Sequence, residues 1–228
     1  MATTAKRSTK KRPTTPDRTD VDIDAKPMDG RAARAMRTRT AIVDALLSLL
    51  EEGDLQPPAN RIAERAGISL RLIYHHFGDL ESLFSAAAKR EGERMAALAT
   101  PIDLAAPLDA RIHDLVAERT KMLEWITPVR RAALLQEPFS TELTAARQAF
   151  FTVGEQQVRS IFGPELDQLD EPRRAVVVSA LHGVLLWGYW NDLRVSGRSL
   201  DEARDALELT VTAILAAAGR GQPPAMAL

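Results

Sequence analysis

Residues 59–77, ANRIAERAGISLRLIYHHF, place two short helical segments on either side of one glycine. Gly67 can adopt the left-handed backbone conformation that ends a helix. Ser69 is a favoured N-cap residue, so a second helix should begin directly after it. Ile73 and Phe77 are four residues apart and would hold that second helix against its neighbours. This spacing predicts a helix-turn-helix motif.

The rest of the chain is also helical in pattern. From residue 31 onward apolar residues recur with a period near 3.6, with almost no strand signal. One long apolar helix is expected over about 171–194 and another from residue 200. The predicted fold class is all-α with about nine helices, in which a three-helix N-terminal helix-turn-helix domain precedes a C-terminal helical bundle. Breaks between helices are expected at Thr100–Pro101, Ala106–Pro107, Thr127–Pro128, Gly163–Pro164, Glu171–Pro172 and Ser196–Gly197.

Charge is distributed unevenly along the chain. Residues 1–78 carry 14 Lys and Arg against 10 Asp and Glu, whereas residues 79–228 carry 16 against 21. A basic N-terminal part suggests a polyanionic partner, although a solvated charge run explains the asymmetry equally well. Residues 1–30 hold almost no large apolar side chain, so we expect a disordered basic arm there. Such an arm would contact DNA phosphates without reading sequence, or would act only as a solubilising tail.

Several classes of site are excluded by composition and spacing. The chain has no cysteine, which excludes disulfides and thiolate zinc sites and suits a reducing cytoplasm. We expect neither a secretory signal nor a membrane span, because no long apolar run is present. His75 and His76 are adjacent, so on a helix they point about 100° apart and are unsuited to joint metal ligation. We therefore expect a cytoplasmic protein with no metal and no cofactor.

The second helix of the motif should present a face to DNA. Its outward positions hold residues that suit contact with a duplex, and Arg71 can make the bidentate contact with guanine. Tyr74 and the two histidines can donate to phosphates. Leu70 could meet a thymine methyl group or simply be tolerated, and Leu72 is expected to pack beneath the helix. The candidate DNA-binding residues are Asn60, Ser69, Leu70, Arg71, Tyr74, His75 and His76.

These segments resemble the TetR family of transcriptional repressors. The resemblance covers 41–53 and 61–84, where I-A-x-x-A-G-I-S is followed by I-Y-x-H-F, and also 181–193 and 199–215. It implies a DNA-binding domain over 31–79. It also implies a ligand-binding and dimerisation domain over 80–228, and a repressor that a small effector releases from a double-stranded operator.

The sequence departs from the family pattern at two positions. Pro58 stands where the family usually has a phosphate-binding threonine, and Leu80 stands where it usually has a lysine. Both departures remove contacts to the DNA backbone. Either this protein binds DNA weakly, or the basic arm compensates. The second alternative is supported by four additional arginines, namely Arg31, Arg34, Arg37 and Arg39.

The C-terminal part offers aromatic side chains and a few polar groups for a small apolar, uncharged or weakly polar effector. Core packing explains any single one of these side chains at least as well. The candidate pocket residues are His113, Met122, Trp125, Phe150, Phe151, His182, Trp187 and Trp190.

A homodimer is also expected, because the last two helices are apolar on more than one face. The residues predicted for this contact are Val184, Ala203, Leu207, Val211, Ile214 and Ala218.

Two other functions compete with a nucleoid-associated regulator. One is a small all-α enzyme that uses His182 or His113 as an acid or base. The other is a helical interaction protein with a vestigial helix-turn-helix. We favour the regulator and expect no enzymatic activity, because the chain carries neither a Walker A loop nor a GxSxG elbow.

Overall fold

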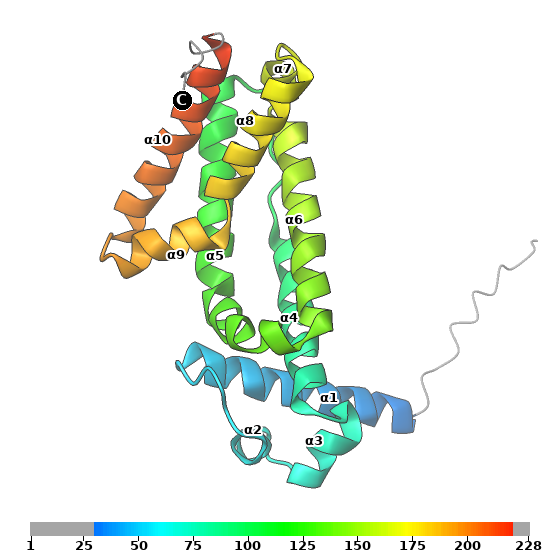
Figure 1. The fold of residues 1–228 in the computed structure, drawn as a ribbon. Helices are drawn as coiled ribbons and strands as arrows, with labels where there is room; N and C mark the ends of the chain where they lie inside the picture. The colour runs from blue at the N-terminus through cyan, green and yellow to red at the C-terminus, as the bar shows by residue number, and fades with distance from the viewer. Residues whose placement is uncertain (1–29, 221–228) are drawn as a thin grey trace, which may run out of the picture.

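The computed structural model describes residues 30–220, and every regular element in this range is a helix (Figure 1). The predicted all-α class is confirmed, while the expected basic arm lies outside the described residues. No helix within this range is long and apolar enough to cross a membrane. The helices are α1 (Gly30–Glu51), α2 (Ala59–Ala66), α3 (Leu70–Phe77), α4 (Leu80–Leu98), α5 (Leu108–Gln136), the 3₁₀ turn η1 (Glu137–Phe139), α6 (Thr141–Ile161), α7 (Gly163–Leu166), α8 (Glu171–Val184), α9 (Trp187–Val195) and α10 (Leu200–Gly219).

The N-terminal core forms around α1, which lies across one end of the molecule with α2 and α3 beneath it (Figure 1). Ile42 and Leu46 on α1 are fully buried, as is Ile73 on α3. The same core includes residues of α4 and two residues of α5, Val129 and Ala132. The long helix α5 therefore belongs to both halves of the molecule, because its N-terminal part packs in the second core.

The C-terminal bundle is built from α5, α6, α8 and α10, which stand roughly upright on the N-terminal domain, with α9 lying crosswise at the foot of α8 and α10 (Figure 1). Val116, Val158, Val178 and Leu207 come from these four upright helices, and each is fully buried. Each of these side chains contacts the others and no longer contacts water. Such burial stabilises the bundle by about 25 cal/mol per Å² of apolar area removed from water.

The break predicted at Thr127–Pro128 is wrong, because α5 runs through it without interruption. Proline has no amide hydrogen, so Pro128 cannot donate to the carbonyl oxygen of Glu124. The hydroxyl of Thr127 donates to the carbonyl oxygen of Leu123 at 2.6 Å. Val129 and Ala132 lie in the turn that follows the proline and are buried in the N-terminal core. Tertiary packing therefore holds the helix together where its local sequence disfavours it.

The single helix predicted over about 171–194 is also wrong, because it is two helices. α8 ends at Val184 and α9 begins at Trp187. Between them Leu186 adopts an extended conformation, with φ −78° and ψ 155°. Leu185 is buried and the indole of Trp190 is fully buried. The change of direction brings both into the C-terminal core.

The stripe assigned to the dimer contact on the last helix packs within its own chain. Ala203, Leu207 and Val211 are fully buried against α5 and α8, and Val184 also packs against this core. Ala203, Leu207 and Val211 are therefore covered within their own subunit, which corrects the interface predicted for them. The opposite face of α10 is exposed instead, and 70% of the surface of Leu209 on that face is accessible to solvent.

Candidate functional site

The turn between α2 and α3 has the geometry that the sequence predicts. Gly67 has φ 66°, and its amide donates to the carbonyl oxygens of Ala63 and Glu64, so it ends α2. Ser69 is the N-cap residue of α3 with extended backbone angles, although its hydroxyl makes no capping hydrogen bond. The predicted boundary is therefore right, while the side-chain contribution expected of Ser69 is missing.

Two buried side chains and one cation fix α3 in place. Ile73 is fully buried and Phe77 is 7% exposed, both in the N-terminal core. The Arg39 guanidinium lies 4.1 Å from the centre of the Phe77 ring, and its Nη1 donates to the carbonyl oxygen of His76 at 2.7 Å. Arg39 thus ties the end of α3 to α1, which differs from the phosphate contact considered for it.

The opposite face of α3 is open to solvent. Leu70 and Tyr74 are 42% and 46% exposed, and Arg71 is also exposed. Ser69, His75 and, on α2, Asn60 are exposed as well. Leu72 is 37% exposed, so the expectation that it packs beneath the helix is wrong. A helix this short buries only two side chains spaced four residues apart, here Ile73 and Phe77, and Leu72 lies outside that buried stripe. The role of these residues toward DNA stays a prediction.

His76 differs from the rest of the predicted DNA-binding set. Its ring is half-buried, and burial lowers its pKa, with smaller contributions in the same direction from His75 and Arg39. The neutral ring is therefore favoured in the folded protein. His75 is exposed and meets His76 edge-on, with ring centres 5.4 Å apart. Of the two histidines, only His75 is exposed to solvent.

Two arginines of α2 that the candidate list omitted are engaged within the domain. Arg65 donates from both terminal nitrogens to the Glu52 carboxylate at 2.7 Å. Arg61 lies 2.9 Å from a carboxylate oxygen of Asp54. These pairs join α2 to the end of α1 and its following turn. Of the two departures from the family pattern, Pro58 is the exposed N-cap of α2, and Leu80 packs against the N-terminal core.

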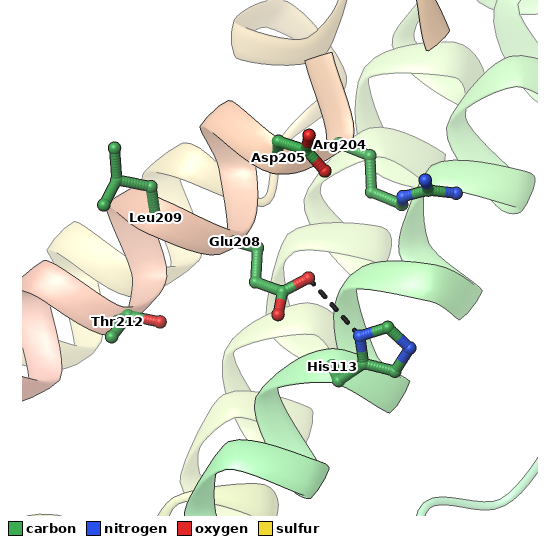
Figure 2. A pocket seen from close by; sticks show the side chains of 6 residues that line it. All are labelled: His113, Arg204, Asp205, Glu208, Leu209 and Thr212. Atoms are coloured by element: carbon green, nitrogen blue, oxygen red, sulfur yellow. Dashed lines mark ion pairs between the residues drawn. The ribbon is translucent and has the colours of Figure 1, made fainter. Parts of the chain in front are cut away.

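Three of the predicted pocket residues lie on separate surfaces. His113 is exposed on α5 beside α10, and its Nδ1 lies 3.5 Å from a carboxylate oxygen of Glu208, at the rim of a shallow polar hollow (Figure 2). Trp125 is 44% exposed and donates from Nε1 to Glu91 of α4. Phe150 is 37% exposed on α6. The structure does not bring these three together.

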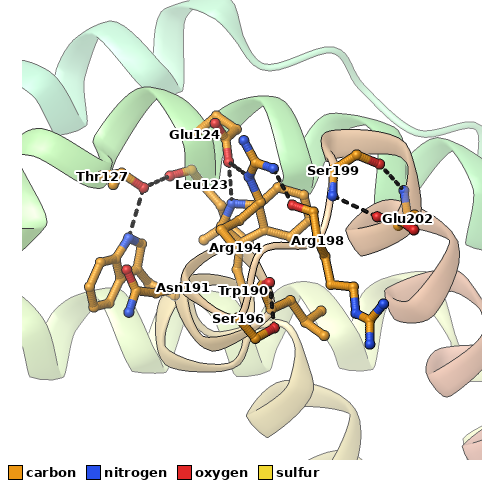
Figure 3. Close-up of polar contacts among 12 residues, drawn as sticks. Leu123, Glu124, Thr127, Trp190, Asn191, Arg194, Ser196, Arg198, Ser199 and Glu202 are labelled. Carbon is orange, nitrogen blue, oxygen red and sulfur yellow. Dashed lines mark hydrogen bonds and ion pairs between the residues drawn. The ribbon is translucent and has the colours of Figure 1, made fainter.

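Three others join helices within the bundle. The Nε1 atom of Trp190 donates to Glu124 Oε1 at 2.8 Å, and that of Trp187 donates to the Thr127 hydroxyl at 3.0 Å (Figure 3). Both bonds tie α9 to α5. Met122 on α5 is half-buried against the C-terminal core.

The last two predicted pocket residues, Phe151 on α6 and His182 on α8, do meet. Their rings lie edge to face with centres 5.9 Å apart. Burial lowers the pKa of His182, Glu155 opposes that shift, and Arg119 adds to it. Arg119 of α5 was not predicted from the sequence as a site residue. Its position four residues from both Leu115 and Leu123 places it in a buried apolar stripe, which was the available signal.

Residues 42–87 match the family model of bacterial regulatory proteins of the tetR family. The chain has a TetR-family DNA-binding domain. The resemblance inferred from the sequence is thereby confirmed, and a chain with this TetR domain is a DNA-binding transcriptional regulator. The comparison with curated proteins gave no match.

Solved structures share the fold. A TetR-family transcriptional regulator from Streptomyces coelicolor is 22% identical, with a TM-score of 0.65 over 81% of this chain and 82% of that one. A transcriptional regulator from a Rhodococcus species is 17% identical, with a TM-score of 0.57 over 80% of this chain and 96% of that one. At these identities the likeness shows a shared fold and nothing more.

Proposed function

We propose that this chain is a homodimeric TetR-family repressor. It binds a double-stranded operator through α3 and releases it when a small, largely apolar effector binds within residues 80–228. The observation that carries the proposal is the two-sided character of α3. Ile73 and Phe77 anchor one side, while Leu70, Arg71 and Tyr74 stand exposed on the other. A short helix held this way can enter a major groove without losing its packing.

Each exposed residue of α3 has a chemical role toward a duplex. Arg71 offers two parallel donors to the O6 and N7 atoms of guanine, which is a sequence-specific contact. The Tyr74 hydroxyl and the His75 ring can donate to phosphates, which positions the helix. Asn60 and Ser69 lie at the starts of α2 and α3, where phosphates would approach the two helix ends.

Helix α5 offers the physical link between the two domains. Val129 and Ala132 lie in the same core as α1, and Val116 lies in the core of the bundle. Trp125, between these segments, donates to the buried Glu91 of α4. A ligand that shifts α5 relative to α6 and α8 would therefore move α1 and α4. That movement would change the separation of two α3 helices in a dimer, and DNA affinity with it.

The dimer would form through the outer faces of α8 and α10. Val176 on α8 is 68% exposed and Leu209 on α10 is 70% exposed, although both helices also pack on the C-terminal core. Large exposed apolar faces mark interaction sites, and a second copy would cover both helices at once. The small exposed residues around them would allow close packing, and these are Ala180, Gly183, Ala213, Ala216 and Ala217.

A small enzyme gains no support from the positions of its two candidate residues. His113 points to the surface beside α10, whereas His182 lies between α6 and α8. The two histidines therefore lie in different parts of the bundle, so at most one of them could act on a given substrate.

The direct test is selection from random-sequence duplexes with the purified full chain. We expect enrichment of one two-fold symmetric site, bound roughly 10³-fold or more tightly than a scrambled duplex of the same composition. Enrichment of nothing beyond the starting pool, with equal affinity for both duplexes, would reject the proposed function.

A further inference from the structure

Arg119 is a buried cation without a carboxylate. It lies on α5, is 5% exposed, and donates from Nη2 to the side-chain oxygen of Gln157 on α6. Within residues 30–220, neither an ion pair nor a second hydrogen bond is found for its guanidinium. Burial alone lowers its pKa to about 10, with no opposing carboxylate. A guanidinium carries five N–H donors, so most of its capacity is unused.

Arg111, on the same helix, shows how this chain compensates a structural arginine. It is 4% exposed, and its guanidinium meets both oxygens of Glu165 at 2.5 and 3.1 Å. It also donates to the carbonyl oxygens of Ala106 and Ile161. The two arginines are equally buried, yet only Arg111 is neutralised. Because burying an unpaired charge is costly, the contrast suggests that Arg119 receives its anion from outside the chain.

His182 adds a second unsatisfied polar group from a third helix. Its Nε2 is buried and has no hydrogen-bond partner. It packs against Gly154 of α6, one helical turn from Gln157, which is the hydrogen-bond partner of Arg119. A Cβ built on Gly154 would lie 2.9 Å from that Nε2, so the glycine allows the ring to sit against α6. Three helices therefore direct polar side chains to one place beside an apolar core.

We propose that the effector carries a carboxylate on an apolar body, and that this group pairs with Arg119 between α5, α6 and α8. A carboxylate accepts two parallel N–H donors from a guanidinium, and it can accept a third from His182. Gln157, the present partner of Arg119, is exposed on α6 and can turn outward to admit the ligand. The apolar body would lie against residues of the C-terminal core such as Val158 and Leu181.

The inference refines the proposed function. Binding of a carboxylate at Arg119 does not depend on that function, whereas an effect of the ligand on DNA affinity does. It replaces the uncharged effector expected from the sequence with an organic acid. Arg119 is ten residues before Val129 on α5, about 15 Å along the helix. Pairing at Arg119 would therefore act on the helix that reaches the N-terminal core.

The test measures the melting temperature of the purified full chain with hexanoate, octanoate, decanoate and benzoate, each beside the alcohol of the same carbon skeleton. We expect at least one carboxylate, and not its alcohol, to raise Tm by roughly 3–6 °C at about ten times its Kd. Arg119→Gln keeps a donor for Gln157 and removes the charge, so it should bind that carboxylate at least tenfold more weakly. Lys121→Gln removes an exposed cation of α5 and is the matched control, which should respond like the native chain.

A second variant covers the case in which Arg119→Gln does not fold. Gly154→Ala leaves Arg119 in place and presses a methyl group on the His182 ring, so it should also weaken the carboxylate response. If no carboxylate stabilises the native chain beyond its alcohol, or if both site variants respond like the native chain, the inference is wrong. DNA affinity measured without any ligand tests the proposed function separately.

Discussion

Arginine side chains in the N-terminal domain divide by what they contact. Arg39 holds the end of α3, and Arg65 binds Glu52 through both terminal nitrogens. Arg71 is exposed on the outer face of α3. Substitution of the first two should therefore lower stability with little change in base preference, because their donors are committed to the fold. Only Arg71 combines exposure with a position on the second helix of the motif.

At the same scale, two histidines make stability depend on pH. The pKa of His76 and that of His182 are both lowered in the folded protein, in each case chiefly by burial. Around His182, Arg119 lowers its pKa further and Glu155 opposes it. A lowered pKa means that the unfolded chain binds a proton more readily than the folded one. The associated stability is present above the unfolded value, about 6.5, and is lost as the pH falls through the folded value.

We therefore expect the free energy of unfolding, measured by urea denaturation, to decrease as the pH falls from 7 to 5. The double variant His76→Gln, His182→Gln should show a smaller decrease over the same range, and each single variant should fall between. An unchanged pH dependence in the double variant would show that other groups cause it.

At the scale of elements, Pro128 is the clearest local conflict with the fold. It lies inside α5, where proline typically costs about 3 kcal/mol relative to alanine, and packing of the following residues holds the helix together. Pro128→Ala should raise the free energy of unfolding by roughly 1–3 kcal/mol, because the amide gained can donate to the carbonyl oxygen of Glu124. Denaturation in urea measures this change.

Pro172→Ala is the matched control, because Pro172 lies in the first turn of α8, where its missing amide hydrogen has no helical partner to lose. It should leave stability nearly unchanged. Equal effects of the two substitutions would mean that Pro128 is not strained.

Local signals predicted the first three helices well, and tertiary packing explains the failures elsewhere. Gly67 and Ser69 mark the turn because backbone conformation and capping are local properties. The break at Leu186 lies between Gly183 and Gly188, each inside a helix, and it brings Leu185 and Trp190 into the buried core. At Pro128 the opposite occurs, because the local sequence predicts the end of a helix and tertiary packing continues the helix through it.

The candidate sites divide in the same way. The outward face of α3 follows from two anchors four residues apart, so Arg71, Tyr74 and His75 could be predicted as exposed. The pocket residues could not, because their meeting depends on how α5, α6 and α8 pack. Only Phe151 and His182 of that set are in ring contact with each other. Val211 was assigned to the dimer because periodicity shows a face but not what covers it.

At the scale of the whole molecule, the dimer depends on the outer face of α8 and α10. Leu209→Glu would place an unpaired charge in that contact at a cost of several kcal/mol, so sedimentation velocity should show a monomer. Leu98→Glu is the matched control, because Leu98 is 68% exposed on α4, close to the 70% of Leu209. It should remain dimeric. A dimer in both variants would place the interface on another surface.

The measurement that tests the central claim most directly compares native protein and Arg71→Ala on duplexes selected from a random pool. If α3 reads the operator, Arg71→Ala should lose roughly 1–3 kcal/mol of affinity for the native site and accept other bases at one position of each half-site. Arg204→Ala, which removes a half-buried arginine of α10 far from α3 in the chain, should leave affinity and selected sequence unchanged. An equal loss on every duplex, with the preferred sequence intact, would show that Arg71 binds a phosphate and would contradict base reading by α3.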